Sequence, residues 1–206
     1  MVRKLLEKQR VIPVLTLENI DDGYFIARLL KRYDFKLLEI TLRNPFALDI
    51  AKGLQQEFSD LKIGVGTVTS IQKMSLVTDE DFAFAVSPGF DPAMVNMADI
   101  ANLPFLPGIN TMTEAMNALS YGLKFLKLFP AEQSGGIEYL KYFNAVMPEL
   151  TFCPTGGISL TNISNYLDQK NVACVGCSDI APQSLIKARD ESGLKERIKA
   201  YQEYNG

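Results

Sequence analysis

The sequence predicts an α/β fold, a closed (β/α)8 or TIM barrel, from three observations. Eight short apolar segments recur at fairly even spacing along the 206 residues. The stretches between them carry the period of an amphipathic helix, and strands that alternate with helices form parallel sheets. Eight such units match the barrel at the short end of its usual size. An open, doubly wound sheet is the alternative, because strand counts from one sequence err easily.

The predicted strands are, in chain order, VIPVLT (11–16), KLLEIT (36–41), KIGVGT (62–67), FAFAVS (82–87), PFLPGI (104–109), KFLKLF (124–129), TFCPTG (151–156) and VACVGC (172–177). Two intervening helices show clear apolar stripes, formed by Ile26, Leu29 and Leu30 and by Leu48, Ala51 and Leu54. The segment around Leu5 and Leu6 predicts a short N-terminal helix that covers the bottom of the barrel. No low-complexity linker interrupts the chain, so we expect a single domain over residues 1–206.

The composition is that of an ordinary globular enzyme with no nucleic-acid or membrane partner. Hydrophobic residues make up 47%, charged residues 22%, and the net charge is -3 with scattered basic residues. No apolar run approaches the ~20 residues needed to cross a bilayer, and the N-terminus MVRKLLEKQR is too polar for a signal peptide. Three cysteines, an odd number, make a disulfide framework improbable. We therefore expect a cytoplasmic, reduced protein.

The chain contains no histidine. This absence excludes Ser-His-Asp and Cys-His nucleophile systems and removes the commonest ligand of catalytic zinc or iron. Acid–base chemistry near neutral pH must therefore come from carboxylates, tyrosine, lysine or water.

Polar residues gather at the carboxyl ends of the predicted strands, where both candidate folds place their active sites. Seven of the eight strands end this way, although the polarity of loops alone could explain several of them. The residues are Glu39, Arg43, Thr67, Ser87, Asn110, Thr111, Lys127, Thr155 and Ser178.

Lys127 is the first candidate catalytic residue. The strand period of two puts Phe125, Lys127 and Phe129 on one face and Leu126 and Leu128 on the other. With the leucines packed under the helices, Lys127 points into the barrel lumen. We expect that enclosed, partly apolar environment to lower its pKa and to favour a neutral amine fit for Schiff-base chemistry. The alternative is a lysine that reaches the surface or pairs with a carboxylate.

Glu39 is the second candidate, because in the segment LLEITLR it shares a face with Thr41 and Arg43. A structural interpretation makes it the partner of Arg43 or Lys127 in an internal salt bridge. The functional interpretation makes Glu39 the proton-transfer group and Arg43 a clamp for a substrate carboxylate, since guanidinium binds planar anions through two hydrogen bonds.

Two glycine motifs follow the last two strands. PTGGIS (154–159) precedes a helix expected near Thr161, and GCS (176–178) follows the final strand. Backbone N–H groups of such loops bind phosphate, and barrels commonly build that site after strands seven and eight. The alternative is a pair of tight turns. The CxxC spacing of Cys174 and Cys177 we interpret as small core residues.

Together these segments resemble the 2-dehydro-3-deoxy-phosphogluconate (KDPG) and 4-hydroxy-2-oxoglutarate (KHG) aldolase family, which uses class I Schiff-base chemistry. The motifs run in order along nearly the whole chain: PVLT, LLEITLR, GVGTV, AVSPGF, LPGINT.TE, YGLKFLKLFPAE..GG, FCPTGGIS and VGCS. The resemblance implies a (β/α)8 barrel, a homotrimer, a small keto-acid substrate and no metal or other cofactor.

The resemblance also implies roles for individual residues. Lys127, not Lys124, would form the imine with pyruvate, and Glu39 would move protons through water. The substrate would contact Arg43, Thr67, Pro88, Phe129 and Thr155. Of these, Arg43 and Thr67 would hold the pyruvate carboxylate, and Thr155 would contact the hydroxyls on the aldehyde side. The phosphate would lie against Gly156, Gly157, Gly176 and Ser178.

One departure from the family pattern concerns the phosphate loop. Cys177 stands where the family usually has a second glycine, and Asp179 follows the serine. A side chain at 177 would crowd a phosphate and an acid at 179 would repel it, which makes an unphosphorylated substrate such as 4-hydroxy-2-oxoglutarate more plausible. A phosphosugar isomerase or epimerase with Glu39 as direct base, and a barrel without catalysis, are the remaining alternatives.

Overall fold

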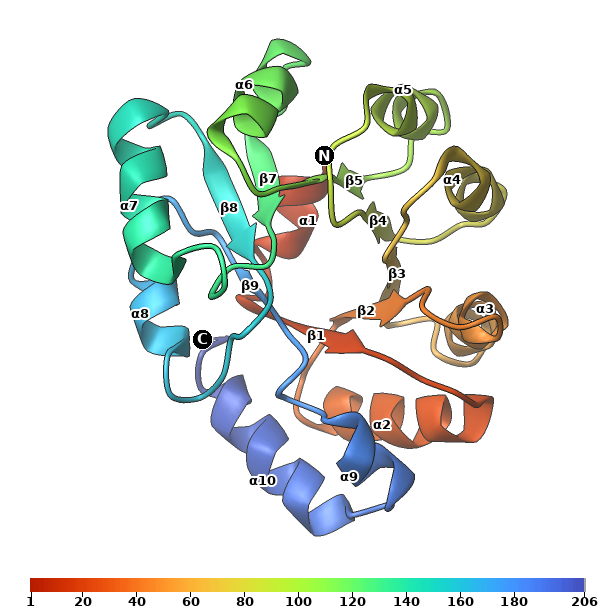
Figure 1. Ribbon diagram of the computed structural model, residues 1–206. Coiled ribbons are helices and arrows are strands. Elements are labelled where there is room, and N and C mark those ends of the chain that lie inside the picture. The colour runs from red at the N-terminus through yellow and green to blue at the C-terminus, as the bar shows by residue number, and fades with distance from the viewer. Residues whose placement is uncertain (206) are drawn as a thin grey trace.

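The computed structural model describes residues 1–205 and shows a curled, parallel sheet surrounded by helices (Figure 1). The strands are β1 Val11–Leu15, β2 Leu37–Thr41, β3 Lys62–Gly66, β4 Phe84–Val86, β5 Phe105–Leu106, β6 Gly108–Ile109, β7 Phe125–Leu128, β8 Thr151–Pro154 and β9 Val175–Cys177. The helices are α1 Val2–Leu6, α2 Ile20–Arg32, α3 Ala47–Glu57, α4 Ile71–Thr78, α5 Pro92–Ile100, α6 Met112–Ser120, α7 Gly136–Val146, α8 Ile163–Leu167, α9 Gln183–Lys187 and α10 Glu191–Gln202.

The hydrogen-bonded ladders close into a barrel. One sheet has the order β5-β4-β3-β2-β1-β9 and the other has the order β6-β7-β8. Two parallel bridges, Phe152 with Val172 and Thr155 with Gly176, join the chain segment around β8 to the segment around β9. At the other junction, β5 and β6 are consecutive pieces of one segment, separated by Pro107, which has no N–H to donate to a ladder. The predicted strand 104–109 is thus two pieces, and the predicted barrel is confirmed in place of the open sheet.

Side chains alternate between two cores, as expected for strands in a barrel. The outer core lies between strands and helices and includes Leu38, Ile40, Leu126 and Leu128. Both predicted helix stripes face this core, although Leu48 is only partly buried. The predicted helix near Thr161 is α8, which begins two residues later, at Ile163, and has five residues.

The inner core fills the lower part of the lumen and is formed by Leu6, Ile12, Leu37, Phe84, Val86, Leu106, Phe125, Cys153 and Cys174. Leu6 belongs to α1, and in Figure 1 this helix lies behind the strands, inside the ring of outer helices. The short N-terminal helix therefore closes the bottom of the barrel, as predicted. With that end filled by apolar side chains, the polar residues of the lumen stand toward the carboxyl ends of the strands. In the part of the chain that is described, no helix has the length and apolar character needed to span a membrane.

Candidate active site

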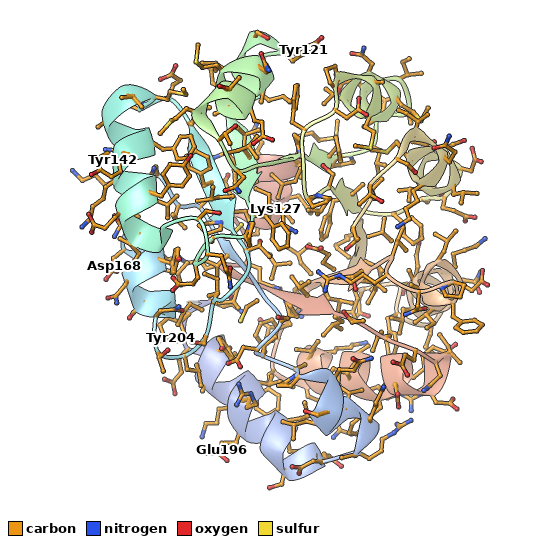
Figure 2. The ribbon with its side chains drawn as sticks, in the orientation of Figure 1. Tyr121, Lys127, Tyr142, Asp168, Glu196 and Tyr204 are labelled. Carbon is orange, nitrogen blue, oxygen red and sulfur yellow. The ribbon has the colours of Figure 1, made fainter. Side chains whose placement is uncertain are left out.

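Lys127 and Glu39 face each other in the lumen. The Nζ atom of Lys127 lies 3.8 Å from Oε1 of Glu39, and the two side chains are only 7% and 5% exposed. Figure 2 shows Lys127 on β7, near the centre of the ring of strands. Charges buried this deeply are found almost only when they are paired. Within the described chain, Glu39 pairs with Lys127 and not with Arg43, so the ion pair of the structural interpretation is present at the centre of the candidate site.

Local sequence explains why both side chains point inward. Leu126 and Leu128 flank the lysine and are buried in the outer core, which leaves Lys127 on the lumen face. Glu39 needs one further feature, because its carboxylate lies against the backbone of β3. A Cβ atom at Gly66 would stand 1.8 Å from Oε1 of Glu39. Glycine at this position therefore makes the space that the Glu39 carboxylate occupies.

One aromatic residue, Phe129, and one proline, Pro88, lie near Lys127. The Nζ atom of Lys127 lies 5.1 Å from the centre of the Phe129 ring, a cation–π distance. Pro88 lies in the loop after β4, and its backbone carbonyl packs on Gly108, where a Cβ atom would come within 2.4 Å. Gly108 is the ladder partner of Lys127. Gly108 thus lies between Pro88 and Lys127, in contact with the first and paired with the second.

Arg43 and Thr67 lie together on the neighbouring loops. Nε of Arg43 donates to Oγ1 of Thr67 over 3.4 Å. Thr67 has a φ of 61°, in the left-handed region that β-branched residues rarely adopt. Lys73 of α4 supports this geometry, since its Nζ donates to the backbone carbonyls of Leu42, at 2.9 Å, and Thr67, at 3.3 Å. Sequence reasoning did not single out Lys73, because its position on a helix gives no sign of these contacts.

Thr155 lies at the end of β8 and is buried. Its Oγ1 donates to the carbonyl of Cys153 over 3.4 Å. A Cβ atom at Gly176 would stand 2.4 Å from the Thr155 Oγ1 atom. The glycine therefore makes room for the threonine hydroxyl, just as Gly66 makes room for Glu39.

A cavity of about 470 Å³ opens at the rim of the barrel beside these residues. Its lining is drawn from β1 and from the loops that follow β2, β8 and β9, and includes Arg43, Gly157, Ser159, Ser178 and Asp179. Gly156 and Gly157 have φ angles of 98° and 78°, and a Cβ at Gly157 would come within 2.5 Å of the Glu132 side chain. The two predicted glycine motifs are thus brought together.

The polar residues at the end of the fifth predicted strand have a different role. Thr111 and Glu114 form a reciprocal capping box at the start of α6. The backbone N–H of Asn110 also donates to Oε2 of Glu114 over 2.7 Å. We expected Asn110 and Thr111 among the polar strand ends, and the structure places both in a helix cap.

The structure corrects the expectation that Cys177 crowds the phosphate loop. Cys177 is fully buried in the outer core, and its Sγ contacts the carbonyl of Ile158 at 3.4 Å. Burial raises the pKa of this thiol, so it stays neutral at physiological pH. The alternation of β9 explains this placement, because Cys174 and Gly176 take the lumen positions. The CxxC residues are core residues, as predicted.

The expectation that an uncompensated Asp179 carboxylate would repel a phosphate is also wrong. Its carboxylate forms a salt bridge with Arg197 and accepts a hydrogen bond from the hydroxyl of Tyr201. Nε of Arg197 donates in addition to the backbone carbonyl of Asp179, over 2.8 Å. Both partners come from α10, so the acid that follows Ser178 has its charge compensated from outside the barrel.

A parallel barrel with a buried lysine facing a carboxylate at its open end has the architecture of a class I aldolase. The model of the family described as "Aldolase: KDPG and KHG aldolase" matches residues 2–196. The chain therefore belongs to the KDPG and KHG aldolase family and is an aldolase, a lyase. This membership favours the aldolase interpretation over the isomerase, epimerase and non-catalytic alternatives.

Relatives in sequence and structure agree with this assignment. The chain is 36% identical over 189 residues to the 2-dehydro-3-deoxy-phosphogluconate aldolase of Pseudoalteromonas atlantica, covering 92% of this chain and 88% of that one. It is 36% identical over 180 residues to the KHG/KDPG aldolase of Escherichia coli K12, and the match covers 87% of this chain and 84% of that one. The KDPG aldolase of Legionella pneumophila, whose crystal structure holds pyruvate as a covalent carbinolamine, superposes with a TM-score of 0.93 at 35% identity over 98% of both chains.

Proposed function

We propose that this aldolase reversibly cleaves 2-dehydro-3-deoxy-6-phosphogluconate to pyruvate and glyceraldehyde 3-phosphate. The observation that supports it most strongly is the buried pair of Lys127 and Glu39, with 3.8 Å between ammonium and carboxylate. An amine and a carboxylate in one enclosed lumen supply a nucleophile and a proton carrier without histidine, metal or other cofactor.

The reaction begins when the neutral amine of Lys127 attacks the C2 ketone. Loss of water gives an iminium ion, which accepts electrons from the neighbouring bond. A water held by Glu39 removes the proton of the C4 hydroxyl, and the C3–C4 bond breaks to release the aldehyde and leave an enamine. Protonation at C3 and hydrolysis of the imine then release pyruvate and restore the lysine.

The surrounding residues bind the two ends of the substrate. Arg43 and Thr67 lie together on adjacent loops, where a guanidinium and a hydroxyl would hold the pyruvate carboxylate. Phe129, whose ring lies 5.1 Å from Nζ of Lys127, would form one wall of the substrate site, and Pro88, which packs on Gly108, would form another. Thr155 directly follows β8, and its hydroxyl would contact the hydroxyls on the aldehyde side of the substrate.

The phosphate would bind at the rim, against the backbone N–H groups of Gly156 and Gly157 and the hydroxyl of Ser178. Gly157 and Ser178 line the same cavity, and left-handed glycines let backbone donors approach an anion closely. Gly176 contributes chiefly by making room for Thr155. The KDPG aldolase of Zymomonas mobilis ZM4, which is 32% identical over 98% of this chain and 94% of that one, with a TM-score of 0.87, has been solved with 3-phosphoglycerate.

A second substrate, 4-hydroxy-2-oxoglutarate, would give pyruvate and glyoxylate through the same imine. The name of the E. coli relative covers both activities, which favours this alternative. Pyruvate release from the phosphorylated and unphosphorylated keto acids, measured side by side, distinguishes them. We expect a higher kcat/KM for the phosphorylated acid, and equal values would refute a phosphate preference.

We also propose that residues 1–206 form one domain, that the chain assembles as a homotrimer and that it acts in the cytoplasm. The family resemblance supports the trimer. Sedimentation velocity at micromolar concentration tests it, with one species of three times the 22.9 kDa chain mass expected. A single species at the monomer mass would refute it.

A further inference from the structure

The loop after β9 carries an ion pair that no step of the proposed chemistry uses. Asp179 and Ser178 both line the rim cavity. Both carboxylate oxygens of Asp179 have a partner. Oδ1 forms an ion pair with Nη2 of Arg197, and Oδ2 accepts a hydrogen bond from the hydroxyl of Tyr201. The side chains of Asp179 and Arg197 are about one third exposed, at 32% and 31%.

Two buried titratable groups beside this loop, Tyr201 and Cys177, are neutral. Burial is the main cause that raises the pKa of the Tyr201 hydroxyl, and it also raises the pKa of the Cys177 thiol. Tyr201 therefore remains a hydrogen-bond donor, and Cys177 contributes no charge. The negative charge of Asp179 is thus balanced by the positive charge of Arg197, and Arg43 adds a further positive charge to the same cavity.

We propose that Arg197 is a specificity-determining residue, which cancels the charge of Asp179 and so allows the Ser178 loop to accept a phosphorylated substrate. The inference rests on the proposed function, because it concerns the phosphate end of that substrate. The unphosphorylated substrate places no dianion against the loop, so Arg197 matters much less for it. The two substrates therefore separate a charge effect from a general loss of structure.

The test measures pyruvate release by Arg197→Met with both keto acids. We expect KM for the phosphorylated acid to rise roughly fivefold, the size expected when a partly exposed ion pair is lost, while KM for 4-hydroxy-2-oxoglutarate changes less than about twofold. The double variant Arg197→Met with Asp179→Asn, which removes both charges, is expected to regain the parent KM. Arg197→Lys, which keeps the charge, is expected to stay near the parent value.

Asp179→Asn alone provides a test that does not depend on how well Arg197→Met folds. It leaves Arg197 without its counter-charge, so KM for the phosphorylated acid falls below the parent value. A matched control is Arg32→Met, which removes another ion pair made to α10, that of Arg32 with Glu191 at 3.6 Å, away from the rim cavity. Equal changes of KM for both substrates, or no rescue by the double variant, would overturn the proposal.

Inorganic phosphate separates this proposal from the proposed function. We expect phosphate to raise the unfolding temperature of the parent protein more than that of Arg197→Met, whether or not either keto acid is cleaved. If the parent cleaves neither acid, the proposed function fails, and the phosphate comparison still decides the role of Arg197. Equal stabilisation of both proteins would contradict that role.

Discussion

The Nζ atom of Lys127 and the Oε1 atom of Glu39 stand 3.8 Å apart in a lumen that solvent hardly reaches. Each of these buried side chains has the other as its partner of opposite charge, and in the proposed reaction the carboxylate would carry protons to and from the amine. One contact therefore pairs two buried charges in the fold and, in the reaction proposed above, would supply the proton carrier.

Replacing the Glu39 carboxylate tests the second of these roles. Glu39→Gln keeps the shape of the side chain and removes its basicity, so we expect kcat to fall by roughly 10²–10⁴, the usual contribution of a positioned acid–base group. Steady-state pyruvate release measures this loss. Glu138→Gln, in an exposed pair with Lys141 at 2.6 Å, is the control and should keep the parent rate. A Glu39→Gln enzyme with the parent kcat would exclude Glu39 as proton carrier.

Gly66→Ala tests the space on which Glu39 depends. The added methyl group would stand 1.8 Å from the carboxylate oxygen, so Glu39 must move and its contact with Lys127 is lost. We expect a loss of kcat of at least roughly tenfold, together with a lower unfolding temperature, because a buried charge loses its partner. Gly89→Ala is the matched control, since a Cβ there meets nothing within 4 Å. Equal kinetics in the two variants would contradict this packing argument.

Lys73→Met tests how Arg43 and Thr67, the proposed carboxylate-binding residues, are held in place. The lysine donates to the carbonyls of Leu42 and Thr67, next to Arg43, and Thr67 stands in a left-handed conformation that costs ~1–3 kcal/mol. We expect KM for the keto acid to rise about tenfold with a smaller change in kcat, because binding geometry is lost and the imine chemistry is not. Lys52→Met removes a surface pair with Glu80 and should leave KM unchanged. Unaltered KM in Lys73→Met would remove its positioning role.

Stability should fall in alkaline solution because of Cys177. Burial raises the pKa of its thiol in the folded protein, whereas the unfolded chain releases the proton near ~8.5. Above that pH the folded state binds more protons than the unfolded state, so stability is lost as pH rises. Urea unfolding at about pH 7.5 and 9.5 measures this loss. Cys177→Ala should lose less stability between the two pH values than the parent protein does, and identical losses would contradict the assignment.

The strand period of two was enough to predict the core of the site. It put Lys127 and Glu39 in the lumen and the flanking leucines under the helices, because each alternating residue in a barrel strand must face one of two cores. The same rule would have placed Cys177 in the outer core, since Gly176 takes the lumen position. The expectation that Cys177 crowds the phosphate loop rested on the family pattern alone and took no account of this alternation.

Contacts between distant segments could not be predicted in the same way. Arg197 lies 18 residues beyond Asp179 and meets it only because α10 packs beside the loop after β9. Lys73 reaches Leu42 across 31 residues for the same kind of reason. Periodicity reports which face of its own element a residue occupies, whereas these ion pairs and hydrogen bonds depend on how elements are placed against each other. The sequence analysis predicted one strand over 104–109 although Pro107 lies within it, and it predicted neither the break nor how the two halves divide between sheets.

The central claim is that Lys127 becomes covalently bound to pyruvate. Incubation with pyruvate and sodium borohydride, followed by peptide mass spectrometry, tests it most directly, because reduction fixes an imine as a stable secondary amine. We expect one adduct per chain, located on Lys127 and absent from Lys127→Ala, with Lys124 unmodified in both. An intact, folded protein that gains no adduct, or an adduct on Lys124 instead, would contradict the account.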